Sequence, residues 1–236
     1  MKKIYACADV HSHLDVFEQA MNDLDSDDEM YIIGDAVDKG PDGLDVLLKI
    51  MKDQRCHMLM GNHDMMMLEY LTCKRKLETR FTGEYQDVKK RWLYINGGLA
   101  TYQRYKRLPE VTKKKIISFL SSLPVLLNMT VEGRKFLLVH AFPQNHGEND
   151  IYVKDLKTFT YRWRSDYIWK REPFHHEEGK IILTGHTPTR NYKDHEILHD
   201  EGWYDLDCGL AYQDSESRLG VLCLNDLSEK YYFPKK

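Results

Sequence analysis

Three short apolar runs lie within the first 64 residues, and each ends in a cluster of glycine, carboxylate, amide or imidazole side chains. We expect these runs, residues 3–8, 30–33 and 57–60, to be strands. Between them, apolar residues recur at helical spacing over residues 14–24 and 44–51. This alternation of strand and helix is typical of an α/β domain, and it limits the chain to a fold with a partly parallel sheet.

The rest of the chain has first a helical pattern and then a series of strand patterns. Residues 74–123 are polar and helical in pattern, and no linker rich in Gly, Ser or Pro frames them, so we expect a helical insertion. Strand patterns without long helices between them follow, at residues 125–130, 135–140, 180–184, 203–207, 219–224 and 230–233. They predict a second, mixed or antiparallel sheet. We therefore expect one domain over residues 1–236, a two-sheet sandwich flanked by helices.

Composition excludes several other classes of protein. The formal net charge of −3 gives no electrostatic footprint for nucleic-acid binding. No apolar run approaches the roughly 20 residues that span a bilayer, and the apolar stretch after Lys3 is too short for a signal peptide. The five cysteines form no Cys-x-x-Cys pair, which argues against a disulfide framework and a zinc ribbon. We expect a cytoplasmic protein, and a monomer because no coiled-coil heptad is present.

Polar side chains with metal-binding chemistry follow five of the expected strands. Ligands bind beyond the carboxyl ends of strands in α/β folds, so these side chains are expected to meet at one edge. Their oxygen and nitrogen donors suit Mn²⁺, Fe or Zn²⁺ better than a soft ion. The set is too large for one metal but fits two if one carboxylate bridges them; its members are Asp9, His11, Asp35, Asn62, His140 and His186.

Two metals of this kind catalyse phosphoryl transfer. They clamp the attacking and leaving oxygens, and they lower the pKa of a bridging water so that hydroxide is available near neutral pH. The chain has no Gly-x-Ser-x-Gly elbow, and this chemistry needs none. The residues thus predict a metal-dependent phosphoester hydrolase that works without a covalent enzyme intermediate.

The ordered motifs resemble the phosphoprotein phosphatase branch of the calcineurin-like metallophosphoesterases, and in particular its bacterial serine/threonine phosphatases. That family carries Asp-x-His-Gly, Gly-Asp-x-x-Asp-Arg-Gly, Gly-Asn-His-Glu/Asp, His-Gly/Ala and Gly-His in this order. Two further segments also resemble it, from Trp92 to Thr101 and from Asp207 to Gly209. The matching stretches here are Asp9-Val10-His11-Ser12, Gly34-Asp35-Ala36-Val37-Asp38-Lys39-Gly40, Gly61-Asn62-His63-Asp64, His140-Ala141 and Gly185-His186.

The resemblance implies two divalent metal ions, most commonly Mn²⁺, in sites that share Asp35 as a bridge. Asp9 and His11 would complete the first site, and the second would be completed by Asn62, His140 and His186. The family fold is a two-sheet sandwich flanked by helices, which agrees with the architecture expected from the strand pattern.

The resemblance also implies a catalytic acid and a phosphate clamp. His63 would protonate the leaving oxygen, with Asp38 orienting it. Lys39 stands where the family has arginine, and lysine keeps the charge but loses the bidentate geometry. A second phosphate-binding arginine is expected between the last two metal-binding histidines, with Arg164 preferred and Arg162 as the alternative.

The expected substrate follows from the same branch. A phosphoserine or phosphothreonine protein is the leading class, and a dinucleoside polyphosphate such as diadenosine tetraphosphate, hydrolysed symmetrically, is the alternative; other small phosphoesters stay open. A non-catalytic metal-binding module of the same fold is a further alternative. It predicts missing ligands or a missing acid, whereas His63 and Asp38 are both present.

Overall fold

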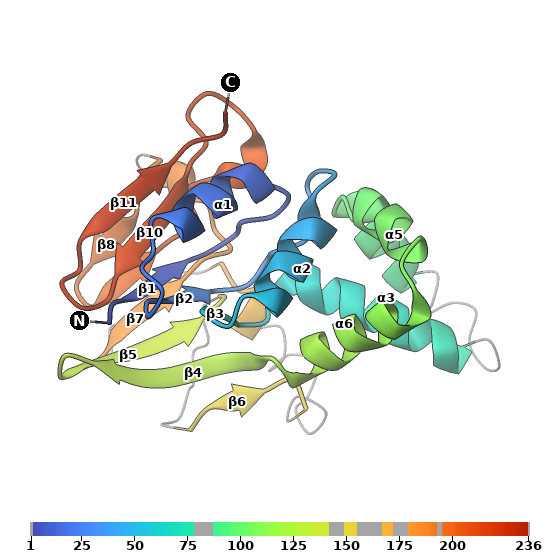
Figure 1. Cartoon of the computed structure of the whole chain (residues 1–236), viewed down its shortest axis with the longest axis horizontal. Helices are drawn as coiled ribbons and strands as arrows, with labels where there is room; N and C mark the ends of the chain where they lie inside the picture. The colour runs from blue at the N-terminus through green and yellow to red at the C-terminus, as the bar shows by residue number, and fades with distance from the viewer. Residues whose placement is uncertain are drawn as a thin grey trace.

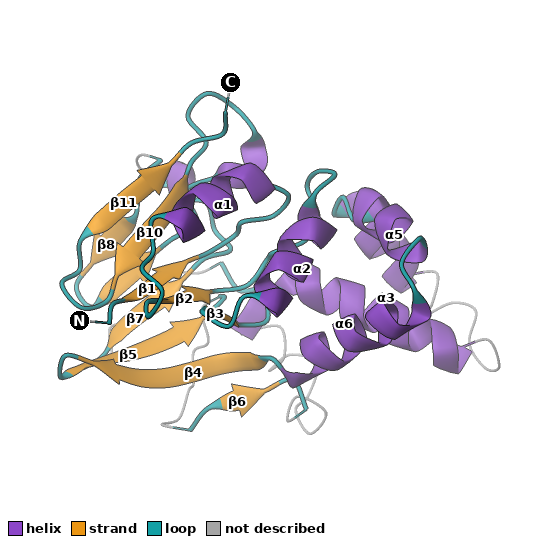
Figure 2. Cartoon of the chain, viewed as in Figure 1, coloured by secondary structure: helices purple, strands orange, loops and turns teal. Residues whose placement is uncertain are grey.

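The computed structural model describes residues 2–77, 87–141, 149–154, 167–171, 179–192 and 195–235. Within them the strands form a five-stranded and a six-stranded sheet (Figures 1 and 2). The first sheet has the order β11-β10-β1-β2-β3, with strands Glu229–Tyr232, Leu219–Cys223, Ile4–Cys7, Glu29–Ile32 and Cys56–Met58. The second has the order β6-β4-β5-β7-β9-β8, with strands Ile151–Tyr152, Pro124–Val131, Arg134–Val139, Ile181–Thr184, Trp203–Asp205 and Leu198–Asp200.

Both sheets are mixed. β1, β2 and β3 run parallel, and β10 joins β1 from the other side in antiparallel register. In the second sheet β5, β7 and β9 are parallel, while β4 pairs antiparallel with β5. The α/β fold with two sheets and flanking helices is therefore confirmed. Strands β6 and β8 were not expected, because they are two and three residues long and too short for an apolar pattern.

Alternating residues of β1 face two separate parts of the core. Tyr5 and Cys7 pack in the cluster that the helices share, whereas Ala6 packs with residues of both sheets, among them Leu138 of β5 and Leu222 of β10. Successive side chains of a strand point to opposite faces, so one strand can line both layers. The small Ala6 side chain lets the second sheet lie close to the end of β1, where the polar residues follow.

The helices lie outside the sheets and at one end of them (Figure 1). α1 (Leu14–Asn22) and α2 (Gly43–Lys52) connect the parallel strands of the first sheet. Residues of the expected insertion form the end of α3 (Asn62–Leu77), the π-helix η1 (Lys90–Ile95), α5 (Leu99–Lys106) and α6 (Glu110–Ser122). Trp92 and Leu93 of η1 are buried, which anchors this helical group to the rest of the core.

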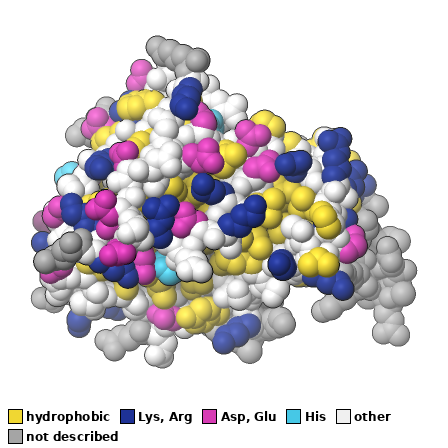
Figure 3. All heavy atoms as spheres, in the orientation of Figure 1, with side chains coloured by type: hydrophobic (Ala, Val, Ile, Leu, Met, Phe, Trp, Pro, Cys, Tyr) yellow, Lys and Arg dark blue, Asp and Glu magenta, His cyan; other side chains and the backbone are white. Residues whose placement is uncertain are grey.

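The face shown in Figure 3 mixes acidic and basic side chains rather than gathering one sign of charge. None of the helices in the described ranges combines the length and the apolar composition needed to cross a membrane.

Candidate active site

Polar residues at the carboxyl ends of five strands converge between the two sheets. β1, β2 and β3 belong to the first sheet, and β5 and β7 to the second. The strand ends were expected to meet at one edge, and the structure brings the ends of strands from both sheets together there. The residues that follow the strands are Asp9 and His11, Asp35, Asn62 and His63, His140, and His186.

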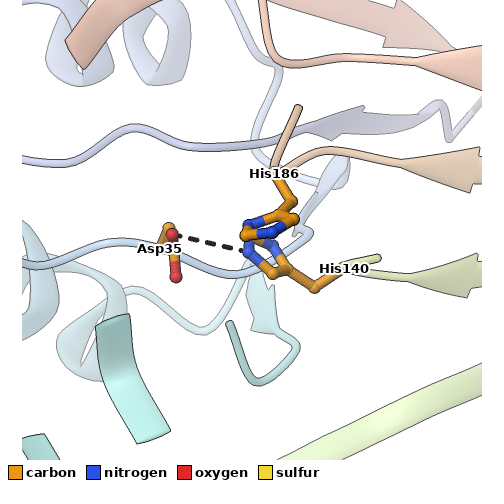
Figure 4. Close-up of side chains that lie close together, drawn as sticks. All are labelled: Asp35, His140 and His186. Atoms are coloured by element: carbon orange, nitrogen blue, oxygen red, sulfur yellow. Dashed lines mark ion pairs between the residues drawn. The ribbon is translucent and has the colours of Figure 1, made fainter. Parts of the chain in front are cut away.

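Two groups of potential metal ligands share one carboxylate. Asp35 lies with His140 and His186 in one group, and with Asp9 and His11 in the other; within each group the ligand atoms lie within 4.8 Å of one another. Figure 4 shows the first group, with Asp35 Oδ2 3.4 Å from His140 Nε2. Asn62 Oδ1 lies 3.0 Å from the same nitrogen. The six candidate ligands are thus brought to one place.

Backbone carbonyls aim two of the imidazole rings at this cluster. The Nδ1 atom of His11 donates to Val37 O, and that of His140 donates to Ile33 O, each over 2.8 Å. A carbonyl can only accept, so Nδ1 of each ring carries a proton and Nε2 is the nitrogen that faces the carboxylates. Such second contacts fix the tautomer of metal-ligating histidines. The donor set therefore fits divalent metal ions.

The carboxylates divide their oxygens between the backbone and the cluster. Asp9 Oδ2 accepts from the amide of His186 over 2.9 Å, and Asp35 Oδ1 accepts from the amide of His63 over 2.9 Å. The other oxygen of each carboxylate, Asp9 Oδ1 and Asp35 Oδ2, faces His11 at 3.8 and 4.0 Å. His186 Nε2 lies 3.2 Å from Trp169 O, which leaves Nδ1 for a metal.

The histidines of the cluster differ in their affinity for protons. Burial, together with the neighbouring His63, lowers the pKa of His11 to about 3, and burial with the neighbouring His140 lowers the pKa of His186 to about 3. Burial acts the same way on His140, but the carboxylates of Asp35 and Asp9 outweigh it and raise the pKa of His140 to about 10. Two imidazoles are therefore ready to bind a cation, whereas His140 must first lose a proton.

This difference predicts that metal binding releases a proton. Metal-free protein holds the His140 proton at neutral pH, since the pKa of that ring is raised to about 10. A metal needs the neutral ring, so about one proton leaves on binding and the affinity rises up to about tenfold per pH unit between about pH 6 and 8. Calorimetric titration with Mn²⁺ in two buffers of different ionisation enthalpy measures this release. Affinity and heat that are independent of pH and buffer would contradict it, and His140→Gln is expected to lower the release by about one proton.

Left-handed backbone conformations concentrate at the same place. Nine non-glycine residues in the described ranges have positive φ, and six of them are predicted site residues. Such conformations are costly for residues with a side chain and persist where the surrounding structure enforces them, commonly at functional sites. The six are Asp9, His11, Asp35, Asp38, Lys39 and His186, with φ between 48° and 73°.

Glycines precede three of the ligands for two different reasons. Gly34 has φ +79°, so it makes a sharp turn directly before Asp35. Gly61 and Gly185 lack a positive φ and serve close approach instead. A Cβ on Gly61 would lie 2.1 Å from Asp35 Oδ1, and one on Gly185 would lie 2.2 Å from Asp9 Oδ2. Any side chain at either position would displace a metal-facing carboxylate.

His63 and Asp38 form a buried pair beside the cluster. His63 Nδ1 donates to Asp38 Oδ2 over 2.8 Å, and Asp38 is fully buried. Burial lowers the pKa of His63, but the carboxylates of Asp35 and Asp38 outweigh it and the pKa is raised. Trp92 Nε1 and Thr101 Oγ1 also donate to Asp38, each over 2.8 Å. The pair holds the protonated imidazole that a general acid requires.

Asp64 connects two turns of the site, a role that was not predicted from the sequence. It lies in the first turn of α3, and its buried carboxylate accepts from the amides of Asp35, Ala36 and Gly61. Burial and the charge of Asp35 raise the pKa of Asp64 to about 7. It ties the turn after β2 to the turn after β3. In the sequence, the only indication of this role is that Asp64 directly follows His63, the predicted acid.

Two cations line the cavity among the residues that the structure describes. The cavity has a volume of about 440 Å³, and Lys39 and Arg171 line it together with five of the six predicted ligands, all except His140. Arg171 Nη1 donates to the carbonyl of His186 over 2.8 Å. Arg171 was not predicted from the sequence, because nothing in its spacing distinguishes it from the nearby arginines. Arg162 and Arg164 lie outside the described residues.

Ser12, which replaces the expected glycine, adds a hydroxyl outside the ligand cluster. Its Oγ donates to the carbonyl of Asp38 over 2.8 Å. This contact ties the turn after β1 to the turn that carries the predicted acid partner.

Comparison with known proteins identifies one family over most of the chain. The model of the calcineurin-like phosphoesterase family matches residues 2–213. A curated relative, the uncharacterized protein MJ0912 of Methanocaldococcus jannaschii, is 25% identical over 223 residues, which are 92% of this chain and 76% of the relative.

Two solved structures share the fold. A proposed diadenosine tetraphosphatase is 17% identical with a TM-score of 0.57, over 97% of this chain and 92% of that one. A protein serine/threonine phosphatase from Saccharomyces cerevisiae, with similarity to human phosphatase PP5, is 14% identical with a TM-score of 0.57, over 99% of this chain and 80% of that one. At these identities the likeness concerns the fold alone.

Proposed function

This chain belongs to the calcineurin-like phosphoesterase family, and from that premise we propose that it is a phosphatase of phosphoserine and phosphothreonine in proteins. Metal-dependent phosphoester hydrolysis is the chemistry that the family and the ligand groups support. The proposal adds two metal ions, most commonly Mn²⁺, because Asp35 is common to both ligand groups. Bound there, the ions would supply Lewis-acid activation of water and of the phosphoryl oxygens.

The side chains around the cluster have separate tasks in this proposal. Lys39 and Arg171 line the cavity and would hold the phosphoryl oxygens by charge-assisted hydrogen bonds. His63 would give a proton from Nε2 to the leaving oxygen, since its Nδ1 is bound by Asp38. The carbonyl contact from Arg171 to His186 keeps that cation at the rim of the ligand cluster.

The observation that carries the proposal is the pair of His63 and Asp38, in which both carboxylate oxygens of Asp38 accept hydrogen bonds. An alkyl alcohol such as serine leaves as a strongly basic alkoxide unless it receives a proton in the transition state. A nucleotide leaves as a weakly basic phosphate and gains much less from an acid. Asp38 is buried behind His63, and both of its carboxylate oxygens accept hydrogen bonds. Such a site is suited to the alkoxide, which is the leaving group that needs a proton more.

A specific feature favours the alternative, symmetrical hydrolysis of a dinucleoside tetraphosphate. Tyr212 lines the cavity and is 51% exposed, and the guanidinium of Arg190 lies 4.3 Å from the centre of its ring. An aromatic ring held by a cation on one face could stack a nucleobase on the other.

Parallel assays separate the two substrates. Metal-stripped protein reloaded with Mn²⁺ receives a phosphothreonine peptide and diadenosine tetraphosphate, and chromatography resolves phosphate and nucleotides. We expect a kcat/KM for the peptide at least about a hundredfold higher, because the acid pair assists an alkoxide far more than a nucleotide. ADP as the main product would overturn the protein-phosphatase assignment in favour of the alternative. Tyr212→Ala should then lower nucleotide turnover only.

A further inference from the structure

Three hydrogen bonds occupy the buried carboxylate of Asp38, and two of them come from residues to which the proposed mechanism gives no role. Oδ2 accepts from His63 Nδ1 and from the indole nitrogen of Trp92, both over 2.8 Å. Oδ1 accepts from the hydroxyl of Thr101 over 2.8 Å. The amide of Asp38 also donates to the Thr101 oxygen over 3.2 Å, so Thr101 contacts both ends of this residue.

Both additional donors come from the helical segment after α3 rather than from the sandwich. Trp92 lies in η1 and Thr101 in α5, 54 and 63 residues from Asp38 along the chain. Both side chains are fully buried. The Trp92 ring packs against Tyr70 and Tyr102, with centroid distances of 5.2 and 6.0 Å. The indole is therefore fixed by its packing before it meets Asp38.

The indole of Trp92 packs directly against Gly98, which has no side chain to obstruct it. A Cβ at this position would lie 2.3 Å from the indole nitrogen of Trp92 and 2.6 Å from two of its ring carbons. Any larger residue would push the indole away from the carboxylate. The turn between η1 and α5 thus leaves the space that the Trp92 contact needs.

We propose that Trp92 and Thr101 are positioning residues that hold Asp38 in the orientation by which it directs His63 toward the leaving oxygen. The inference rests on the proposed phosphomonoester hydrolysis. A carboxylate bound only by His63 could rotate about its Cβ–Cγ bond and take the imidazole with it. With one fixed donor on each oxygen, the carboxylate plane is set, and the ring of His63 with it. Through these two residues, the helical segment helps to orient the proposed acid, His63.

The dependence of rate on the leaving group tests this placement. In the Mn²⁺-loaded protein, Thr101→Val removes its hydroxyl donor at nearly constant volume, and Trp92→Phe removes the indole N–H while keeping an aromatic ring in its place. We expect each to lower kcat on phenyl phosphate about tenfold, and to change kcat on 2,4-dinitrophenyl phosphate less than about twofold, because only the poorer leaving group needs the acid. Gly98→Ala should give the same pattern by displacing the indole.

Matched variants separate this role from general support of the fold. Leu93→Ala opens a cavity in the same π-helix without touching Asp38, so it should lower the melting temperature and affect both substrates equally. Thr101→Ser keeps the hydroxyl and should restore the wild-type ratio of the two rates. Equal losses on both substrates in Trp92→Phe and Thr101→Val would overturn the inference. Wild-type protein inactive on either ester would instead count against the proposed function.

A spectroscopic measurement tests the contact without turnover. In metal-free protein labelled with ¹⁵N-tryptophan, the indole resonance missing from Trp92→Phe identifies Trp92. A hydrogen bond to a buried carboxylate should place this resonance downfield and slow its exchange with water. We expect Asp38→Ala to move it upfield and speed its exchange, while the other indole resonances stay in place. An unchanged Trp92 resonance in Asp38→Ala would overturn the inference whatever the activity.

Discussion

Replacing Asp35 by asparagine is expected to remove nearly all hydrolytic activity, with kcat/KM at least about a thousandfold lower. Asp35 is common to both ligand groups, so the loss of its charge weakens both at once. Asparagine has almost the same shape, and its side-chain oxygen can still accept the amide of His63. The loss should therefore appear in metal content, measured by elemental analysis, and in turnover, with the circular dichroism of the protein unchanged.

Asp45→Asn is the matched control for this experiment. Asp45 lies in α2 and pairs with Arg104, away from the residues that line the cavity. It should keep both metal and activity. Full hydrolysis by Asp35→Asn would contradict the shared-carboxylate site. A wild-type protein that binds metal but hydrolyses no phosphoester would instead favour a non-catalytic module of this fold.

Replacing His63 by asparagine should produce a large effect of a different kind. We expect kcat on the phosphothreonine peptide to fall by about a hundred- to a thousandfold, because the leaving alkoxide loses its proton donor. The asparagine amide can still bond Asp38, and the backbone contact of residue 63 with Asp35 is unaffected. Metal content should stay at the wild-type level, which distinguishes this variant from Asp35→Asn. Rate measurements with elemental analysis of the same samples check both statements.

The leaving group again supplies the internal control. His63→Asn should hydrolyse 2,4-dinitrophenyl phosphate at a rate within about tenfold of wild type, since that group leaves without a proton. His199→Asn, in β8 and outside the cavity, should behave as wild type on every substrate. Unchanged turnover of the peptide by His63→Asn would contradict the assignment of His63 as the acid.

Much of the fold and of the ligand cluster could be predicted from the sequence because their signals are local. A buried strand reads as a short apolar run, and the turn that follows it displays the next polar residues in a nearly fixed direction. Asp9 after β1 and His186 after β7 are examples. Gly34 shows the same locality, since its positive φ is a property of one turn.

The contacts of the helical segment could not be predicted from the sequence. Its helices could be expected from polarity and apolar spacing, but the contact of Trp92 with Asp38 spans 54 residues and depends on how η1 packs against Tyr70. The same holds for Arg171, whose place at the cavity depends on its contact with the carbonyl of His186. Neither contact leaves a periodic or short-range trace in the chain.

The sequence by itself predicted which residues come together at the candidate site, and the tertiary structure alone decided how they face one another. His140 meets Asp35 at 3.4 Å only because the second sheet packs against the first and brings the end of β5 to the end of β2. A strand pattern specifies which face is buried but not which strand lies across the interface. Pairing between layers is set by packing over long sequence separations, and that information is distributed over the whole core rather than held in any one motif.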